Sequence, residues 1–130
     1  MDLESGKPVF IEELVQNPTQ HANKTVRITG ILHAYDPAFD RAEVADGLNL
    51  LIVDTQLLGV QKYNVGQIYQ LIGVISDVHN DQMAPPINLF KEAQYSLDIV
   101  LRARVVWEVD GLDMAIYKKT VLAMRQALEC

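Results

Sequence analysis

The chain has 130 residues, 49% of them hydrophobic and 22% charged, which is typical of one globular domain and not of a disordered segment. Seventeen acidic and eleven basic residues give a net charge of −6, which argues against a stand-alone nucleic-acid binder built on clustered Lys and Arg. The single cysteine, Cys130, excludes a disulfide scaffold and a cysteine-built zinc site. No apolar run approaches the length of a membrane span or a signal sequence, so we expect a soluble, intracellular protein.

The N-terminal part of the sequence predicts a loose arm followed by a short helix. Residues 1–8 are polar and contain Gly6 and Pro8, so we expect a flexible arm there and a single domain over residues 9–130. Residues 9–16 carry their apolar side chains at helical spacing, and Pro18 ends the helix. One or two helical turns can plug the end of a larger structure but cannot form its core.

Alternation between apolar and polar residues predicts five strands, at residues 25–35, 41–45, 48–53, 67–78 and 97–108. The Asp46-Gly47 pair between the second and third strands indicates a tight hairpin. Gly30 and Gly73 lie in the middle of two strands, where a glycine commonly marks a bulge or the sharp coil of a closing barrel. Residues 79–96 contain a pair of prolines and fit neither a strand nor a helix.

These elements predict an all-β protein with flanking helices, the second of which covers residues 112–128. Five mainly antiparallel strands with mid-strand glycines bury their apolar faces best by closing into a small barrel. A long segment between the fourth and fifth strands fits the OB-fold. The same number of strands also fits an SH3-like barrel. The long strands and the terminal helix favour a five-stranded OB-fold barrel with a short N-terminal helix and a long C-terminal helix.

The helix predicted over residues 112–128 carries more hydrophobic surface than one barrel needs. At about 100° per residue its apolar side chains cover about 200°, whereas a helix that lies on a single core needs about 100°. One stripe consists of Leu112, Ile116, Thr120, Ala123 and Ala127. The other stripe consists of Met114, Tyr117, Val121, Met124 and Leu128, at alternating spacings of three and four residues, which is the repeat that helix pairing requires.

We therefore predict that the second stripe, Met114, Tyr117, Val121, Met124 and Leu128, is a partner interface. Methionine and tyrosine are typical of interfaces, because Met fills irregular gaps and Tyr keeps a polar tip. The alternative is a wide hydrophobic helix that lies half-sunk between the barrel and the 79–96 segment.

No constellation of residues predicts an enzyme or a metal site. His21, His33 and His79 are far apart in the sequence and have no Cys or carboxylate at metal-ligand spacing. The acidic residues between positions 36 and 46 lack the glycine of a calcium loop, and there is neither a Gly-rich phosphate loop nor a nucleophile motif. We expect a non-enzymatic protein without a metal or a cofactor. A small enzyme on a barrel scaffold is the alternative from another class.

OB barrels bind single-stranded nucleic acid across their second and third strands. Near that face the sequence offers Tyr35 and Arg41, and Arg27 and Arg104 lie on outward faces of the first and last strands. We predict these four residues as candidate DNA or partner contacts, together with loop residues such as Phe90. Acidic neighbours dilute this set, so we expect weak binding by the isolated chain and a contact inside a larger assembly.

Four segments resemble the Ten subunit family of the CST (Ctc–Stn–Ten) telomere complex. They are VRITGIL (26–32), LLIVDTQLL (50–58), VGQIYQLIGVI (65–75) and ARVVWEVDGLDMAIYKKTV (103–121). The last segment runs from a strand through Val-Asp-Gly-Leu-Asp-Met into an apolar helix with Tyr117, which is similar to the C-terminal signature of that family. The ordered set covers most of the predicted barrel and the C-terminal helix.

The resemblance implies an OB-fold subunit similar to the small subunit of replication protein A, located at telomeres in the nucleus. It implies pairing with an Stn-like OB-fold subunit through the C-terminal helix and assembly with a Ctc-like large subunit. It further implies support for binding of single-stranded telomeric DNA and, indirectly, for fill-in by DNA polymerase α–primase, with no membrane involved. By the same resemblance the pairing role falls on the predicted stripe, and a DNA or partner contact falls on Arg27 and Arg104.

Two points stay open within this resemblance. The alternative in the same fold is the small structural subunit of replication protein A itself, which acts in general DNA replication and repair. The 79–96 segment is longer than the connection expected for the family, and it leaves the position of the DNA face undecided.

Overall fold

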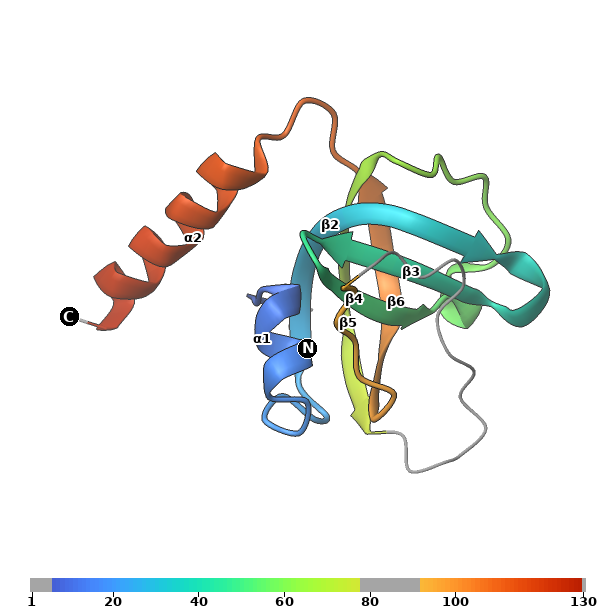
Figure 1. Ribbon diagram of the computed structural model, residues 1–130, viewed down its shortest axis with the longest axis horizontal. Coiled ribbons are helices and arrows are strands. Elements are labelled where there is room, and N and C mark those ends of the chain that lie inside the picture. Colours follow the sequence, from blue (N-terminus) through green and yellow to red (C-terminus); the bar gives the residue numbers. More distant parts are fainter. Residues whose placement is uncertain (1–5, 78–91, 130) are drawn as a thin grey trace, which may run out of the picture.

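The structure, a computed structural model, describes residues 6–77 and 92–129, and this part of the chain contains six strands and two α-helices (Figure 1). Short 3-10 turns at Pro37–Phe39 and Gln56–Leu58 lie between strands that follow each other in the chain. The elements in chain order are β1 (Lys7–Pro8), α1 (Ile11–Gln16), β2 (Thr25–Asp36), β3 (Arg41–Asp46), β4 (Asn49–Asp54), β5 (Ile68–Asp77), β6 (Ile99–Glu108) and α2 (Met114–Glu129).

The strands β2 to β6 form a closed barrel, because β2 pairs with two different neighbours. Its first part, from Thr25 to Ile31, pairs antiparallel with β5, and its second part, as far as Asp36, pairs antiparallel with β3. Strand β3 turns back into β4, and β5 pairs antiparallel with β6. A short parallel pairing of β4 with β6, at Val53 and Leu101, closes the barrel. This is the topology of the OB-fold, so the predicted fold class is confirmed.

Two glycines allow the strands to bend around the barrel. Gly30 lies where β2 passes from one neighbour to the other, and a Cβ atom there would come within 2.7 Å of the Ala45 carbonyl oxygen. Gly73 lies beside a bulge in the pairing of β5 with β6, and a Cβ atom there would come within 2.8 Å of the Ala103 Cα atom. The prediction that these glycines mark a bulge and a closing barrel is confirmed.

Helix α1 lies against one end of the barrel and contributes to its core (Figure 1). Ile11 and Leu14 are fully buried and join the apolar side chains that point inward from the five barrel strands. The Glu13 carboxylate accepts a hydrogen bond of 2.9 Å from the Phe10 N–H group and so caps the start of the helix. The short helix predicted over residues 9–16 is therefore present, and it plugs the barrel as its length suggested.

The bounds of the barrel strands and of both helices lie within one or two residues of the predicted ones. The N-terminal arm is an exception, because Lys7 and Pro8 pair in parallel with Val26 and Arg27. The arm predicted over residues 1–8 thus ends in a short strand, which two residues are too few to reveal by periodicity. Residues 1–5 and most of the predicted 79–96 segment lie outside the described residues.

Replacement of Gly73 by alanine should destabilise the protein, because the added methyl group would collide with backbone atoms of Arg102 and Ala103. Overpacking of this kind costs about 1–3 kcal/mol, and here the colliding atoms belong to a paired strand that cannot move freely. Urea unfolding should show a free energy of unfolding lower by about 2 kcal/mol or more.

The control is Ser76→Ala, a half-buried position on the same strand, which should change the free energy of unfolding by less than about 0.5 kcal/mol. A Gly73→Ala variant as stable as the wild type would show that the bulge does not need a glycine.

Candidate partner interface

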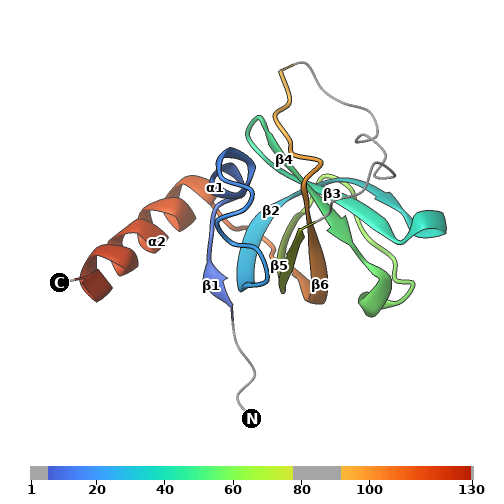
Figure 2. The same cartoon turned by 90° about the horizontal axis from the view of Figure 1, so that it is seen from below.

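Helix α2 begins at Met114, because the preceding residues end β6 and cap the helix. Gly111 adopts a φ of +70°, a left-handed conformation that favours glycine. The Asp113 carboxylate accepts hydrogen bonds from the N–H groups of Ala115 (2.9 Å) and Ile116 (3.2 Å). Figures 1 and 2 show the helix leaving the end of β6, passing on the side of α1 and extending beyond the barrel.

Arg125 attaches α2 to the N-terminal part of the chain. Its guanidinium donates to both carboxylate oxygens of Glu13, at 2.8 and 2.9 Å, and to the Pro8 carbonyl oxygen at 2.8 Å. The same group lies 4.9 Å from the centre of the Phe10 ring. The hydrogen bonds from Arg125 hold the pKa of the Glu13 carboxyl below its usual value, against the effect of partial burial.

Lys118 makes the second attachment, to the barrel. Its ammonium lies 2.8 Å from the carboxylate of Asp46 at the end of β3. Lys118 and Arg125 are seven residues apart, about two helical turns, so they share one side of α2. The sequence-based predictions missed both anchors. The spacing of the two cations indicated that they share one side of the helix. It did not indicate their partners, because Glu13 and Arg125 are 112 residues apart in the sequence and only the fold brings them together.

The predicted interface stripe is divided by this arrangement. Val121 is 4% exposed and lies on the side of the helix that meets the rest of the chain, and Met114 and Tyr117 are half-buried. Met124 is 54% exposed and Leu128 is 84% exposed. The stripe thus begins against the chain's own body and ends in solvent, and its role as a partner interface stays a prediction.

The other apolar stripe faces away from the barrel for most of its length. Ile116 is 61% exposed, and the smaller side chains that follow it on this stripe are exposed as well. Together with the two exposed residues of the predicted interface stripe, they span about 140° of the helix without a charged residue, and the half-buried Tyr117 lies within this span. We call this surface the free arc of α2, and it consists of Ile116, Thr120, Ala123, Met124, Ala127 and Leu128.

The fold separates the four candidate DNA or partner contacts. Arg27 and Arg104 lie on the outward sides of β2 and β6, where Arg104 is exposed and the Arg27 guanidinium lies 5.6 Å from the centre of the Trp107 ring. Tyr35 instead packs edge-on against Tyr63, with 4.6 Å between the ring centres. The side chain of Arg41 is only 14% exposed, and its Nη2 atom lies 3.5 Å from Glu43 Oε2.

The outward side of β3 and β4, which OB barrels use for single strands, is covered in this protein. Glu43, Leu50 and Ile52 alternate with core residues along these strands, yet each is 3% exposed or less. Beside β4, the Leu50 N–H group donates to the Gln94 carbonyl oxygen (2.8 Å) and the Gln94 N–H group donates to the Leu48 carbonyl oxygen (2.7 Å). Arg41 therefore offers little surface to a ligand, and the loop candidate Phe90 lies outside the described residues.

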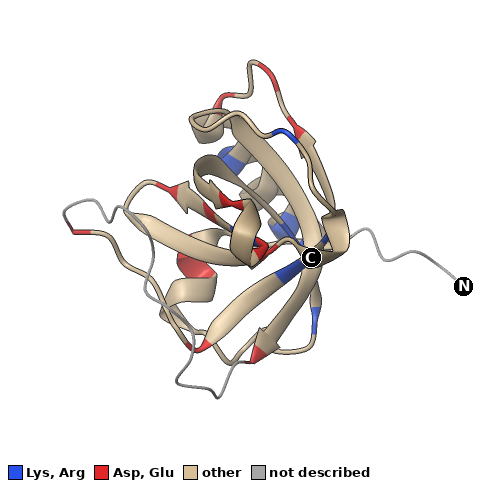
Figure 3. Ribbon diagram, turned by 90° about the vertical axis from the view of Figure 1, so that its right-hand side faces the viewer, with Lys and Arg blue, Asp and Glu red and all other residues tan. Residues whose placement is uncertain are grey.

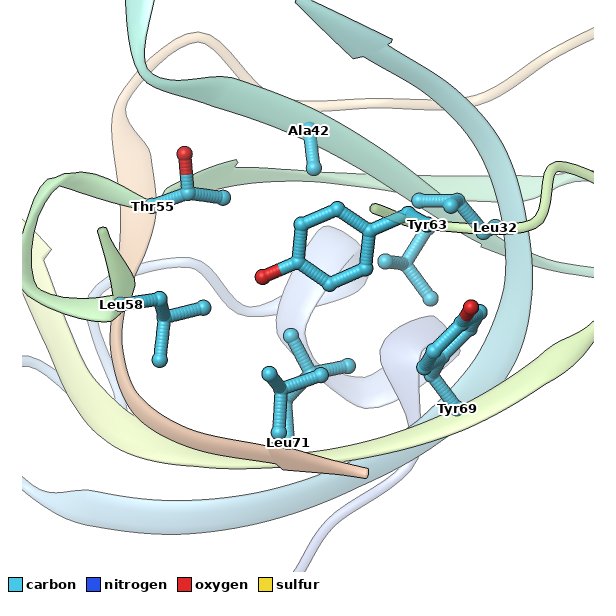
Figure 4. A pocket seen from close by; sticks show the side chains of 9 residues that line it. Leu32, Ala42, Thr55, Leu58, Tyr63, Tyr69 and Leu71 are labelled. Carbon is cyan, nitrogen blue, oxygen red and sulfur yellow. The ribbon is translucent and has the colours of Figure 1, made fainter. Parts of the chain in front are cut away.

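A small cavity lies among the aromatic side chains at one end of the barrel (Figure 4). Its volume of about 10 Å³ is no larger than one water molecule needs, so it holds no ligand. Thr55 and Tyr63 are among the residues that line it, and their hydroxyl groups make no hydrogen bond within the part of the chain that the structure describes. Burial raises the pKa of the Tyr63 hydroxyl. The cavity is a structural feature of the barrel and does not define a binding site.

The described residues contain neither a metal-binding cluster nor a membrane-spanning helix. Over residues 6–77 and 92–129, no group of three His, Cys, Asp or Glu side chains lies close enough together to hold a metal ion. No helix in those two ranges has both the length and the apolar character that crossing a bilayer requires.

Comparison with known proteins agrees with this architecture. A family model described as a telomere-capping, CST complex subunit matches residues 2–130. The CST complex subunit TEN1 of Arabidopsis thaliana is 30% identical over 128 residues, which cover 98% of this chain and 89% of the Arabidopsis protein. Among solved structures, the S. pombe Stn1–Ten1 complex matches with a TM-score of 0.68 at 11% identity, covering 96% of both chains. U. maydis replication protein A bound to single-stranded DNA matches with a TM-score of 0.53 at 13% identity, covering 93% of this chain and 91% of that one.

The closed barrel and its two helices define a small OB-fold protein. The family match over residues 2–130 and the Arabidopsis relative show which family of OB-fold proteins this is. The chain belongs to the family of telomere-capping CST complex subunits, and it is a structural subunit, not an enzyme. The resemblance found in the sequence is thereby confirmed, whereas the likeness to replication protein A extends to the fold alone.

Replacement of Glu13 by glutamine should weaken the attachment of α2 at neutral pH. The pKa of Glu13 is lowered in the folded protein, so its ion pair with Arg125 stabilises the fold above the ordinary carboxyl pKa and is lost as the pH falls through the lowered value. Urea unfolding should show a loss of about 1 kcal/mol at neutral pH, an upper value for a partly exposed pair. In acid, well below the ordinary Glu pKa of about 4.3, variant and wild type should be equally stable.

Glu12→Gln is the matched control, because Glu12 lies on the same helix and is exposed. It should change stability little at either pH. An equal loss for Glu13→Gln at neutral and acidic pH would show that the ion pair does not hold the helix.

Proposed function

We propose that this chain pairs with an Stn-like OB-fold subunit through helix α2, and that the free arc of α2 is the surface that the partner covers. The observation that carries the proposal is the exposure of Ile116, Met124 and Leu128 on one uncharged side of a regular helix. The S. pombe proteins of the matching structure form an Stn1–Ten1 complex, which supports the same kind of pairing for this chain.

The free arc has the geometry of a helix-pairing surface. Ile116, Thr120, Ala123 and Ala127 follow one another at spacings of four, three and four residues, which keeps them on one side of the helix. The small side chains in the middle allow a partner helix to approach closely, and the large ones at both ends provide apolar contact area. Burial of each large apolar side chain contributes roughly 1.5–3 kcal/mol, so three of them support a stable contact.

The predicted stripe and the free arc overlap at Met124 and Leu128. The partner interface predicted from the sequence also contained Met114, Tyr117 and Val121, which face the chain's own body to different degrees. We propose that the partner contacts the exposed end of the predicted stripe and the neighbouring free arc. Val121 then supports the interface from behind by fixing the helix in place.

The alternative of a helix sunk between the barrel and the 79–96 segment is less favoured. In the described part of that segment, the backbone of Gln94 bonds to Leu50 on β4 and to Leu48 in the preceding turn, while Ile116 and Leu128 on α2 remain exposed. The described residues of the segment therefore bond to the barrel and do not cover the exposed apolar side chains of the helix.

Membership of the telomere-capping family supports a wider role. We propose that the chain acts at telomeres in the nucleus, in a complex with a Ctc-like large subunit. In that complex it would support the binding of single-stranded telomeric DNA and, indirectly, fill-in by DNA polymerase α–primase. General DNA replication as a subunit of replication protein A is the less favoured alternative, because the family match is to the telomere-capping subunit.

The double variant Met124→Glu with Leu128→Glu should abolish pairing, because two carboxylates would be buried without partners in an apolar contact. Interface positions of this kind contribute about 2 kcal/mol or more each, so the affinity should fall by at least about a hundredfold. Co-purification with the Stn-like subunit, followed by titration of the purified chains, measures the loss.

Leu122→Glu with Gln126→Glu is the matched control. Both residues are exposed on α2 but lie outside the free arc, and the change in net charge is the same. This variant should pair normally. If it lost pairing as completely as the first variant, the effect would come from charge on the helix and the proposed surface would be wrong.

A further inference from the structure

The outward side of β2, β5 and β6 forms a second surface, distinct from the free arc of α2. Its side chains alternate along each strand with residues of the barrel core. The pairing registers place most of them in three rows: Thr25, Val74 and Arg102; Arg27, Ile72 and Val105; Thr29, Gln70 and Trp107. We call this surface, together with Arg104, the β2–β5–β6 face.

The charge of this face is opposite to that of the whole chain. It carries Arg27, Arg102 and Arg104, and none of the outward positions in its three rows is acidic. The net charge of the chain is −6, and Figure 3 shows acidic positions spread around the barrel at strand ends and in loops. Two arginines in rows that contain no acidic residue, with Arg104 beside them, attract an anionic ligand, even on an acidic protein.

A β-bulge increases the exposure of this face. The register of β5 against β6 shifts between Ile72 and Gly73, so that Arg104 is the extra residue of β6. In a regular strand Val105 would point into the barrel, but here Arg102, Arg104 and Val105 are all exposed. The bulge therefore turns an additional apolar side chain, Val105, to the outside, and Arg104 stays exposed beside it.

Trp107 gives the face an aromatic surface next to its charge. The side chain is half-buried, and the Arg27 guanidinium lies 5.6 Å from the centre of its ring. An arginine held against a tryptophan loses little freedom when it binds a ligand. Aromatic rings beside cations are the combination by which proteins hold single-stranded nucleic acid, with bases on the rings and phosphates on the cations.

We propose that the β2–β5–β6 face binds single-stranded DNA, with Arg27, Arg102 and Arg104 at phosphates and Trp107 against a base. The proposal rests on the proposed function, in which the chain works beside a telomeric single strand. It places the contact on a different face from the one that OB barrels commonly use, since β3 and β4 are covered here. Arginine and tryptophan also occur in protein interfaces, but three arginines on a face whose rows contain no acidic residue fit a phosphate backbone better than a protein surface of mixed charge.

The position of the contact can be measured directly, because Trp107 is the only tryptophan of the chain. The full chain is titrated with an oligothymidylate of about 18 nucleotides, longer than one OB-fold site, at about 20 mM salt, where phosphate contacts are weakly screened. Binding should quench Trp107 fluorescence. The logarithm of the binding constant should fall with the logarithm of salt concentration with a slope of about −2, about 0.7 for each of three phosphates.

The variant Arg102→Glu with Arg104→Glu should lose affinity by about tenfold or more and should make the salt slope shallower by about 1.4, about 0.7 for each phosphate contact removed. Lys62→Glu with Lys119→Glu is the matched control, because both lysines are exposed on other parts of the chain and the change in net charge is equal. This control should keep the affinity within a few fold and should keep the quenching of Trp107.

Three outcomes would overturn the proposal: equal losses in the two double variants, binding without quenching of Trp107, or no binding at low salt. Pairing with the Stn-like subunit is measured on the same proteins by co-purification, and both double variants should pair. A wild-type chain that binds the oligonucleotide but fails to pair would contradict the proposed function and leave the β2–β5–β6 face standing.

Discussion

Helix α2 has more uncharged surface than the described part of the chain covers, and the function that we propose depends on this excess. The barrel is small, and one of its ends is already closed by Ile11 and Leu14 of α1. On α2, Val121 is buried, but Ile116 and Leu128 are exposed to water. Water against large apolar side chains is unfavourable by roughly 1.5–3 kcal/mol for each side chain that could be buried, which makes the association of α2 with another protein favourable.

The attachment of α2 to its own chain is largely ionic, and this leaves the apolar surface available. Arg125 and Lys118 lie on one side of the helix and bond to Glu13 and Asp46, so the helix is oriented by charges at two points. Ionic contacts at partly exposed sites contribute little stability, but their geometry is specific. They hold the free arc facing outward, so that the partner we propose would meet a helix that is already in position.

The barrel has the OB-fold but uses its surfaces differently from OB-folds that bind nucleic acid across their central strands. Glu43, Leu50 and Ile52 are buried on that side, and Arg41 is confined beside Glu43. Arg27 on β2 and Arg102 and Arg104 on β6 lie instead on the outward side of their strands, and Arg104 is the extra residue of a bulge. We thus propose partner binding and DNA binding on separate surfaces of the chain, which would allow both surfaces to be occupied at once in an assembly.

The sequence by itself determined the barrel, its strand bounds to within one or two residues, and the excess of apolar surface on α2, because alternation, helical spacing and mid-strand glycines are local properties of the chain. Only the tertiary structure decided which side of α2 faces the barrel. The spacing of apolar residues shows which side chains share a side of the helix, but it does not show that Glu13 and Asp46, far away in the sequence, bond to Arg125 and Lys118. The tertiary structure also decided that Arg27 shares a face with Arg104 while Arg41 does not. That outcome depends on the register of strands far apart in the sequence and on one bulge beside Gly73, and neither leaves a periodic signal in the chain.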